Sequence, residues 1–247
     1  MSDNVLSRQD AVERAIARTP ARVFAGRAGA GYRTATLLKL REDHAAARDA
    51  VQAEVDLGHD FGSARIERFG LFEVQTQAAS KSEFLRRPDL GRKFAADARE
   101  LVRTNCPGGA NMQVVIGDGL SATAVAVQAP GLLDRLHDSG LSFGRPFLVR
   151  YCRVGVMNDV GDLLAPEVVI LLIGERPGLA TAESLSAYLA FRPRAGHTDA
   201  ERNLISNIHA RGVSLDDATR RILALAELFR HAGRSGVGVT ETERMIS

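Results

Sequence analysis

The chain has 247 residues, of which 45% are hydrophobic and 25% charged, and its formal net charge is +2. Such a length suggests one large domain or two modest ones, and average charged content excludes a disordered or fibrous chain. The longest purely apolar run, Val168–Ile173, has six residues, whereas a membrane-spanning helix needs about 20. No basic start followed by an apolar run marks a secretory signal, so we expect a soluble, cytoplasmic protein.

The basic residues are nearly all arginines, because Lys39, Lys81 and Lys93 are the lysines among 32 basic residues. They are interleaved with acidic residues and have no aromatic platform beside them, which argues against binding of nucleic acid. Cys106 and Cys152 have no partner spacing and are expected to be free thiols. The histidines and cysteines form no HxH, HExxH or CxxC pattern, so we expect no metal site.

The first ninety residues are predicted to form helices and loops. Apolar residues recur at helical spacing from Thr34 to Val55, opposite charged residues, which predicts an amphipathic helix. From residue 56 to 79 no clean period is visible. A second helix is expected from Pro88 and Asp89 to Arg103, since proline and an acidic residue both favour a first helical turn.

After a Pro-Gly-Gly break at residues 107–109, short apolar runs alternate with helical patterns. Ser214 with Asp217 is typical of a helix start, and Gly233 is typical of a helix end. The alternation predicts an α/β fold with a parallel or mostly parallel sheet covered on both faces, and a boundary to the helical part near residues 80–105. The expected strands are Met112–Ile116, Phe147–Val156, Glu167–Ile173 and Ala187–Phe191, and the expected helices follow Ser121, span Ala182–Ser186 and run from Ser214 to Gly233.

Two glycine-rich loops, Gly117–Ser121 and Gly174–Gly178, are candidate sites. Each is expected to leave the carboxyl end of a strand and enter a helix, which is where open parallel sheets bind ligands. Glycine lets the backbone approach a ligand closely, and free N–H groups at a helix start favour an anion such as phosphate. The alternative is that both loops are ordinary turns, with Glu175 and Arg176 solvated.

Six segments resemble, in the same order, the small (light) chain of ethanolamine ammonia-lyase. They are Gly26-Arg-Ala-Gly with Tyr32-Arg-Thr-Ala-Thr-Leu-Leu38, Asp43-His-Ala-Ala-Ala-Arg-Asp-Ala-Val51, Arg87-Pro-Asp-Leu-Gly-Arg92, Gly117-Asp-Gly-Leu-Ser-Ala-Thr-Ala124, Leu172-Ile-Gly-Glu-Arg-Pro-Gly178 and Ile205-Ser-Asn-Ile208. The resemblance spans about residues 18 to 235. It implies a helical N-terminal region, residues 1–90, that contacts the large subunit. A Rossmann-like, cobalamin-contacting domain, residues 91–247, would follow it.

The resemblance also implies an activity. The family depends on adenosylcobalamin and converts ethanolamine to acetaldehyde and ammonia by radical chemistry, after homolysis of the cobalt–carbon bond. The large subunit would carry the barrel, bind ethanolamine and supply most of the chemistry. This chain would close the other side of the corrin, hold no catalytic residue and be active only in the hetero-oligomer. Such a division is reasonable, since a cofactor performs the chemistry while protein supplies binding, orientation and exclusion of water.

The family's cobalamin contacts correspond to three positions of this chain. Val154 would supply apolar and backbone contact, and Glu175 would accept hydrogen bonds from corrin amides or the nucleotide tail. Leu204 stands where the family often has cysteine, so a contact there would rest on bulk or backbone instead of a thiol. For Val154 and Leu204, the alternative is an ordinary place in the core.

Cobalt is not expected to take a histidine from this chain. Asp56-Leu-Gly-His59 and Asp134-Arg-Leu-His137 each have one residue too many for the Asp-x-His-x-x-Gly motif of many cobalamin enzymes. Their mismatch agrees with the resemblance, because this family keeps the cofactor's own base on cobalt. The expected cofactor site is therefore a wall that contacts the corrin and its tail.

The Thr34–Val55 helix, with Arg22, Arg27 and Arg33, is predicted to form part of the surface for the large subunit. One alternative is an independent nucleotide-binding oxidoreductase. It needs a complete dinucleotide fingerprint, whereas after Gly29-Ala-Gly31 the third glycine is replaced by threonine. The other alternative is a purely structural interaction subunit that never touches cofactor.

The expected location is the cytoplasm, with enclosure in a bacterial microcompartment as the alternative. Some family members carry a longer leader associated with such enclosure, whereas about twenty residues precede the first matching segment here. Neither a membrane nor a nucleic acid is an expected partner.

Overall fold

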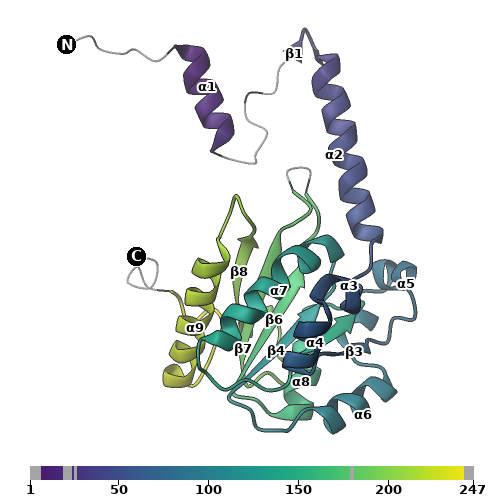
Figure 1. The fold of residues 1–247 in the computed structure, drawn as a ribbon, viewed down its shortest axis with the longest axis vertical. Helices are drawn as coiled ribbons and strands as arrows, with labels where there is room; N and C mark the ends of the chain where they lie inside the picture. The colour runs from purple at the N-terminus through teal and green to yellow at the C-terminus, as the bar shows by residue number, and fades with distance from the viewer. Residues whose placement is uncertain (1–6, 19–23, 25–26, 179–180, 242–247) are drawn as a thin grey trace, which may run out of the picture.

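The computed structural model describes residues 7–18, 24, 27–178 and 181–241, which form an α/β protein (Figure 1). Its main sheet has six strands in the order β3-β5-β4-β6-β7-β8. The fold class predicted from the sequence is confirmed: a mostly parallel sheet is flanked by helices and preceded by a helical N-terminal region. The strands are β3 (Phe72–Gln75), β4 (Met112–Gly117), β5 (Phe147–Arg150), β6 (Val168–Gly174), β7 (Leu185–Phe191) and β8 (Arg202–Ile208).

Strand direction gives the sheet one edge at which several loops meet. β3, β5, β4 and β6 run parallel to one another, whereas β7 is antiparallel to β6 and β8 is antiparallel to β7. The four parallel strands therefore end at the same edge, which we call the carboxyl edge. β7 begins there, since Leu185 pairs with Gly174, and β8 ends there, since Ile208 pairs with Leu185.

Helices cover both faces of the sheet because its central strands carry apolar residues on both sides. Val114 and Ile116 of β4 belong to one core and Val115 to the other, as alternation along a strand requires. The first core is covered by α3 (Leu57–Phe61), α4 (Ser63–Phe69), α7 (Ala122–Asp138) and α9 (Leu215–Ala232), and the second by α6 (Ala96–Asn105) and α8 (Val156–Leu164). The short α5 (Lys81–Arg86), η1 (Leu90–Arg92) and η2 (Asp199–Glu201) complete this sheet body.

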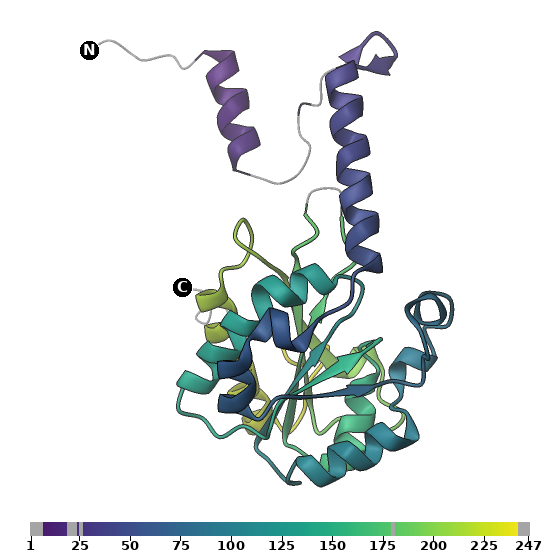
Figure 2. The same cartoon turned by 45° about the vertical axis from the view of Figure 1, so that its right-hand side comes forward.

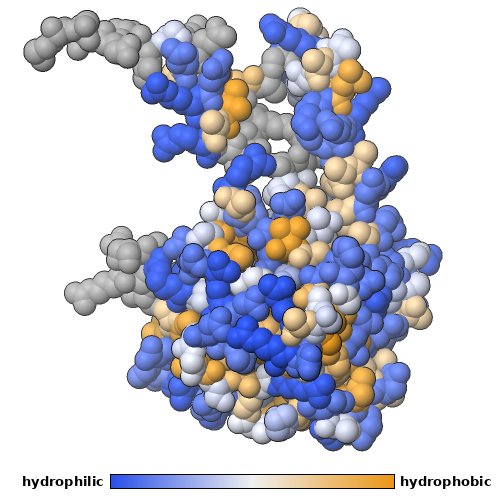
Figure 3. Space-filling view, viewed as in Figure 1, coloured by the Kyte–Doolittle hydropathy of each residue, from blue (hydrophilic) through white to orange (hydrophobic). Residues whose placement is uncertain are grey.

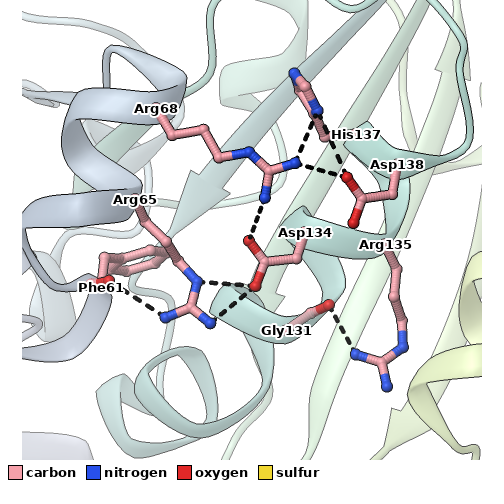
Figure 4. A network of polar contacts seen from close by, with 8 residues as sticks. All are labelled: Phe61, Arg65, Arg68, Gly131, Asp134, Arg135, His137 and Asp138. Carbon is pink, nitrogen blue, oxygen red and sulfur yellow. Dashed lines mark hydrogen bonds and ion pairs between the residues drawn. The ribbon is translucent and has the colours of Figure 1, made fainter.

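Helix α4 is attached to α7 by a polar network (Figure 4). The Arg65 guanidinium donates to Asp134 Oδ2 from two nitrogens, at 2.9 and 2.8 Å, and to the Phe61 carbonyl oxygen at 3.4 Å. Arg68 donates to Asp138 at 2.6 Å. These contacts join the segment before β3 to the helical layer, so residues 57–69 belong to the sheet body.

The N-terminal region projects from the sheet body in both ribbon views (Figures 1 and 2). It contains α1 (Arg8–Ala17), a ribbon of β1 (Arg27–Ala28) and β2 (Gly31–Tyr32), and α2 (Thr34–Gln52). We call its described residues, 7–18, 24 and 27–52, the arm. The buried residues of α2, Ala47 and Ala50, lie in its C-terminal half, and the helix contacts α7.

Several large apolar side chains of the arm are exposed to solvent. Figure 3 shows hydrophobic surface on α1 and on the part of α2 far from the sheet body. Monomeric proteins seldom gather such side chains on a projecting segment without a partner. The exposed residues are Ile16, Phe24, Tyr32, Leu37 and Leu38.

The most strongly patterned predictions are confirmed. The helix predicted from Thr34 is α2, and β4, α7, β6 and α9 form where the sequence indicates. Ser214 caps α9 by accepting a hydrogen bond from the Asp217 N–H, and Gly233 ends the helix in a left-handed conformation.

The helix predicted for residues 88–103 is wrong in its first half. The chain forms η1, becomes extended at Lys93 and Ala95, and only then enters α6. Tertiary contacts cause the break: the Phe94 N–H donates to the Asp159 carboxylate at 2.9 Å. Gly91 is packed so closely that a Cβ there would lie 2.8 Å from the Tyr151 carbonyl oxygen.

Two further predictions fail beside the carboxyl edge. The strand expected over Phe147–Val156 ends at Arg150, and α8 begins at Val156. Ala182–Ser186 is not helical; β7 begins at Leu185, because pairing with β6 outweighs the weak helical preference of a short segment.

Strand β3 lies before residue 91 and nevertheless pairs with β5, so the sheet draws on both predicted units. The division into residues 1–90 and 91–247 stays a prediction. Arg22, which we predicted at the intersubunit surface, lies outside the described residues. Within residues 7–18, 24, 27–178 and 181–241, no helix combines the length and the apolar composition needed to cross a membrane.

Candidate functional site

A hollow of about 300 Å³ opens at the carboxyl edge, and we call it the edge hollow. Val154, Glu175 and Leu204 all line it, although they come from three separate segments. Leu204 is 45% exposed and Val154 is only partly buried, so neither is an ordinary core residue. Tyr188 of β7 and Ile173 of β6 add to the apolar wall. The structure thus gathers the three predicted residues on one concave surface.

The loop Gly117–Ser121 leaves β4 and enters α7, as predicted. Ser121 Oγ accepts the Ala124 N–H at 3.1 Å and donates to the Ala182 carbonyl oxygen at 2.6 Å. Gly119 has a φ of 57°, and a Cβ there would lie 2.3 Å from the Gly174 carbonyl oxygen. Glycine is therefore required at residue 119, because this loop packs directly against the loop that follows β6.

The loop Gly174–Gly178 does not enter a helix, and this part of the sequence prediction is wrong. It leads from β6 to the antiparallel strand β7. Within the turn, the Glu175 N–H donates to the Ser184 carbonyl oxygen at 3.0 Å and the Gly178 N–H to the Thr181 carbonyl oxygen at 3.1 Å. Since no helix starts here, the loop lacks the row of free N–H groups that would hold a phosphate.

The Glu175 carboxylate accepts three hydrogen bonds from its own chain. The hydroxyls of Ser184 and Ser186 donate to different oxygens at 2.7 Å, and the Asn207 N–H donates at 2.9 Å. Asn207 is held in a left-handed conformation, with a φ of 62°. Glu175 thus connects the loop after β6 to β7 and β8. An ionised carboxylate offers about four acceptor positions, so one further donor can still be accommodated.

Asp118 is buried and shapes the loop that carries Val154. Its carboxylate accepts the Tyr151 N–H at 2.9 Å and the Cys152 N–H at 2.8 Å. Burial raises the pKa of Asp118, and the positive charge of the buried Lys81 opposes that rise. Tyr151 has a φ of 57°, an unfavourable conformation for a bulky residue, so the carboxylate fixes strained backbone three residues before Val154.

A second hollow, of about 580 Å³, adjoins the edge hollow, and Arg153 and Val154 line both. Three buried polar atoms on its wall lack a hydrogen-bond partner in the part of the chain that the structure describes: Arg153 Nε, His197 Nδ1 and Arg202 Nε. The Arg202 side chain is only 5% exposed. Because buried polar groups are normally paired, this wall is suited to a polar ligand.

Sequence reasoning missed Asp118, Arg153 and Tyr188 as residues that shape or line the site. A signal was present for two of them: Asp118 stands between two glycines directly after a buried strand, and Arg153 is adjacent to Val154. Tyr188 offered no such signal, because its place depends on the pairing of β7 with β6.

These features define the class of protein. It is an α/β protein with a concave surface, partly apolar and partly basic, at the edge where open parallel sheets bind ligands. It also carries a projecting arm with exposed apolar residues.

Comparison with known proteins gives the family. Residues 9–240 match the sequence profile of the ethanolamine ammonia-lyase light chain (EutC). The ethanolamine ammonia-lyase small subunit of Clostridium perfringens is 40% identical over 225 residues, which cover 90% of this chain and 74% of that protein. The corresponding subunit of Clostridium acetobutylicum is 39% identical over 225 residues, 90% of each chain. That of Clostridioides difficile is 40% identical, covering 90% and 75%. The chain belongs to the ethanolamine ammonia-lyase light chain family.

Proposed function

We propose that the chain is the small subunit of an adenosylcobalamin-dependent ethanolamine ammonia-lyase that converts ethanolamine to acetaldehyde and ammonia. Its role would be to complete the cobalamin site against a large catalytic subunit. The observation that carries this proposal is the gathering of Val154, Glu175 and Leu204 around one hollow at the carboxyl edge. Membership of the light chain family supports it.

The chemistry of the two hollows fits cobalamin. A corrin is a broad, largely apolar disc fringed with amide groups, and it carries a nucleotide tail. Val154, Leu204 and Tyr188 offer apolar contact, and Glu175 offers an acceptor for amide N–H groups. The guanidinium groups of Arg153, which lines both hollows, and of Arg202, which lines the second, would supply donors to amide or phosphate oxygens. Cobalt would be held within the corrin and would take no ligand from this chain.

When bound, adenosylcobalamin supplies the radical chemistry of the reaction. The residues of this chain would bind and orient it and keep water away from one side. We assign no catalytic residue to this chain. Cys152, the thiol at the edge hollow, is buried, and burial raises its pKa well above the usual range, which leaves it a poor nucleophile. Ethanolamine would bind mainly to the large subunit, and activity would require both chains.

The arm would supply part of the surface for the large subunit. Leu37 and Leu38 are exposed on α2, and the exposed Arg27 and Arg33 lie at its N-terminal end. An apolar stripe rimmed by charged residues is typical of a protein–protein interface. The chain and its partner would thus form a hetero-oligomer.

The two alternatives make different predictions. An independent nucleotide-binding oxidoreductase is disfavoured, because neither glycine-rich loop offers an open pyrophosphate cradle. The loop after β6 enters no helix. The loop Gly117–Ser121 does enter α7, but it packs against the loop after β6, and its Asp118 and Leu120 N–H groups donate to the Val149 and Gly174 carbonyl oxygens. A purely structural subunit would need none of the residues around the edge hollow, and a binding experiment separates it from the proposed role.

The test uses the chain co-expressed with its large subunit and titrated with cobalamin. We expect Val154→Asp to weaken cobalamin binding at least about tenfold, because it places a charge against an apolar disc. Val127→Asp is the matched control, since Val127 is an exposed valine on α7 outside both hollows. Unchanged affinity in both Val154→Asp and Glu175→Ala complexes would favour the purely structural subunit.

A further inference from the structure

Three arginines lie around the junction of the two hollows. Arg153 lines both, Arg92 lines the second hollow and Arg176 lines the edge hollow. Arg92 belongs to η1, Arg153 to the loop after β5, and Arg176 to the loop after β6. Arg92 packs against the loop that carries Arg153, since a Cβ on Gly155 would lie 2.9 Å from Arg92 Cγ. The fold therefore brings together three cations that are distant in sequence.

Arg153 lies among cations, and its attraction to the buried Asp118 is weaker than its repulsion from Arg176 and Arg92. Burial lowers the pKa of the Arg153 guanidinium most, and the positive charges of Arg176 and Arg92 lower it further. The guanidinium lies 4.2 Å over the Phe84 ring and donates to the Phe84 carbonyl oxygen at 3.3 Å. Its Nε is buried and finds no partner among the described residues. Like charges held together in this way call for an anion to neutralise them.

The acidic residues of the two hollows do not meet this need. Asp159 accepts the Phe94 N–H and pairs with Arg99, both at 2.9 Å, and Asp199 pairs with Arg202. Asp162 accepts the Ala195 N–H at 3.3 Å, and Glu175 accepts its three hydrogen bonds from β7, β8 and the turn between β6 and β7.

Two of the three arginines have side chains available to a ligand. Arg92 and Arg176 are both exposed. Within the described part of the chain, neither guanidinium makes a hydrogen bond or an ion pair. The junction of the hollows therefore presents positive charge that the chain itself leaves uncompensated.

We propose that Arg92, Arg153 and Arg176 bind the phosphodiester in the nucleotide tail of cobalamin. A guanidinium presents a planar fork of donors that matches two phosphate oxygens, and several of them around one anion fix its position. The macrocycle would then lie toward Val154 and Leu204 while its tail is held at the junction. This assignment rests on the proposed function, because it names the residues that recognise one part of the same cofactor.

The experiment compares cobalamin with cobinamide, which keeps the corrin but lacks the nucleotide tail and its phosphodiester. Dissociation constants are measured for both ligands with the complex of this chain and its large subunit. We expect Arg92→Gln and Arg176→Gln each to weaken cobalamin binding roughly three- to tenfold, since exposed charges are partly screened. Arg153→Gln should weaken it about tenfold or more because Arg153 is half-buried. Cobinamide binding should change less than about twofold in all three, since it lacks the anion.

Arg230→Gln is the matched control. Arg230 is also exposed, but it pairs with Glu167, which precedes β6 at the opposite edge of the sheet. Its removal should leave both dissociation constants unchanged. Arg176→Glu, which reverses the charge, should weaken cobalamin binding more than Arg176→Gln.

The proposal is overturned if the arginine variants leave cobalamin binding unchanged, or weaken cobalamin and cobinamide equally. In that case cobalamin binding, and the proposed function with it, still stands. If the unmodified complex binds neither ligand, the proposed function fails and this assignment fails with it. If Arg153→Gln does not fold, the dissociation constants of the Arg92→Gln and Arg176→Gln complexes test the proposal, because both residues are exposed.

Discussion

The arm and the sheet body use apolar side chains in opposite ways. In the sheet body, Leu172 is fully buried between strands and helices, whereas Leu38 of the arm is 57% exposed. Helix α2 has 19 residues and buries two alanines. A helix with so little packing gains little stability from tertiary contacts within its own chain. The comparison indicates that the sheet body is stabilised from within, and that the arm is shaped for contact with another chain.

The same contrast holds for polar groups. Asp118 and Glu175 each use a carboxylate to hold left-handed backbone beside the hollows, at Tyr151 and Asn207. Acids of the arm instead form short-range pairs on an exposed helix, as Lys39 does with Glu42 and Asp43. The carboxylates of Asp118 and Glu175 therefore determine the shape of the site, whereas those of the arm add only solubility and a small helical stabilisation.

The largest expected effect is a loss of stability, which is measured by truncating one leucine of the sheet body and one leucine of the arm. Leu172→Ala should lower the free energy of unfolding by about 3 kcal/mol, because it opens a cavity in the core. Leu38→Ala should lower it by less than about 0.5 kcal/mol in the isolated chain, because the side chain is exposed. Urea denaturation measures both. Equal losses would mean that Leu38 is packed as tightly as a core residue, so that the arm is stabilised by its own chain.

The arm variant has a second readout that sharpens the comparison. In the complex, Leu38→Ala should weaken association with the large subunit about three- to tenfold, since truncating an interface residue costs about 1 kcal/mol. Val127→Ala, an exposed residue of α7, serves as control. Unchanged association for Leu38→Ala, Leu37→Ala and the double variant would remove the arm from the proposed interface.

An intermediate effect is expected for a buried carboxylate. Asp118→Asn should lower the free energy of unfolding by about 2 kcal/mol, because one backbone N–H loses its acceptor and the buried Lys81 loses its neighbouring negative charge. Asp49→Asn on the exposed face of α2 should change it by less than about 0.5 kcal/mol. Thermal or urea unfolding of both variants gives the result. If Asp118→Asn were as mild as Asp49→Asn, the carboxylate would not be holding the loop before Val154.

The smallest effect is a pH dependence. His209 is buried, and burial lowers its pKa. Its Nδ1 accepts the Arg211 N–H at 3.3 Å, so Nε2 carries the proton toward Asn207 Oδ1 at 2.7 Å. Because the folded-state pKa lies below the ordinary value of about 6.5, stability is intact above that pH and falls as the pH drops through it.

The measurement is a series of melting temperatures between pH 7.5 and 5. His209→Gln should show a shallower loss of stability on acidification than the unmodified chain. His44→Gln, which changes an exposed histidine of the arm, should follow the unmodified chain. An identical acid slope in all three proteins would show that His209 does not contribute to the pH dependence.

A structural element could be predicted from the sequence where its own residues encode it, and could not where it depends on contacts with distant residues. Elements with strong local patterns, such as β6 and α9, could be predicted because composition and caps indicate them directly. The strand expected over Ala187–Phe191 is likewise confirmed as part of β7. The start of β7 could not be predicted, because Leu185 and Ser186 join the strand through pairing with β6, a contact that their own segment does not encode. The extended break before α6 likewise depends on the distant Asp159.

The residues of the candidate site could be predicted, whereas their arrangement in space could not. Val154, Glu175 and Leu204 could be selected because short segments around them resemble one family. Their meeting in one hollow, and the convergence of Arg92 and Arg153, depend on how loops from different strands meet at the carboxyl edge. Single-sequence reasoning gives no distance between such loops.

The most direct measurement is a high-resolution structure of this chain assembled with its large subunit and cobalamin. We expect density for the macrocycle between the two chains, in contact with Val154 and Leu204. Density for the macrocycle away from both hollows, or enclosed by the large subunit alone, would contradict the account.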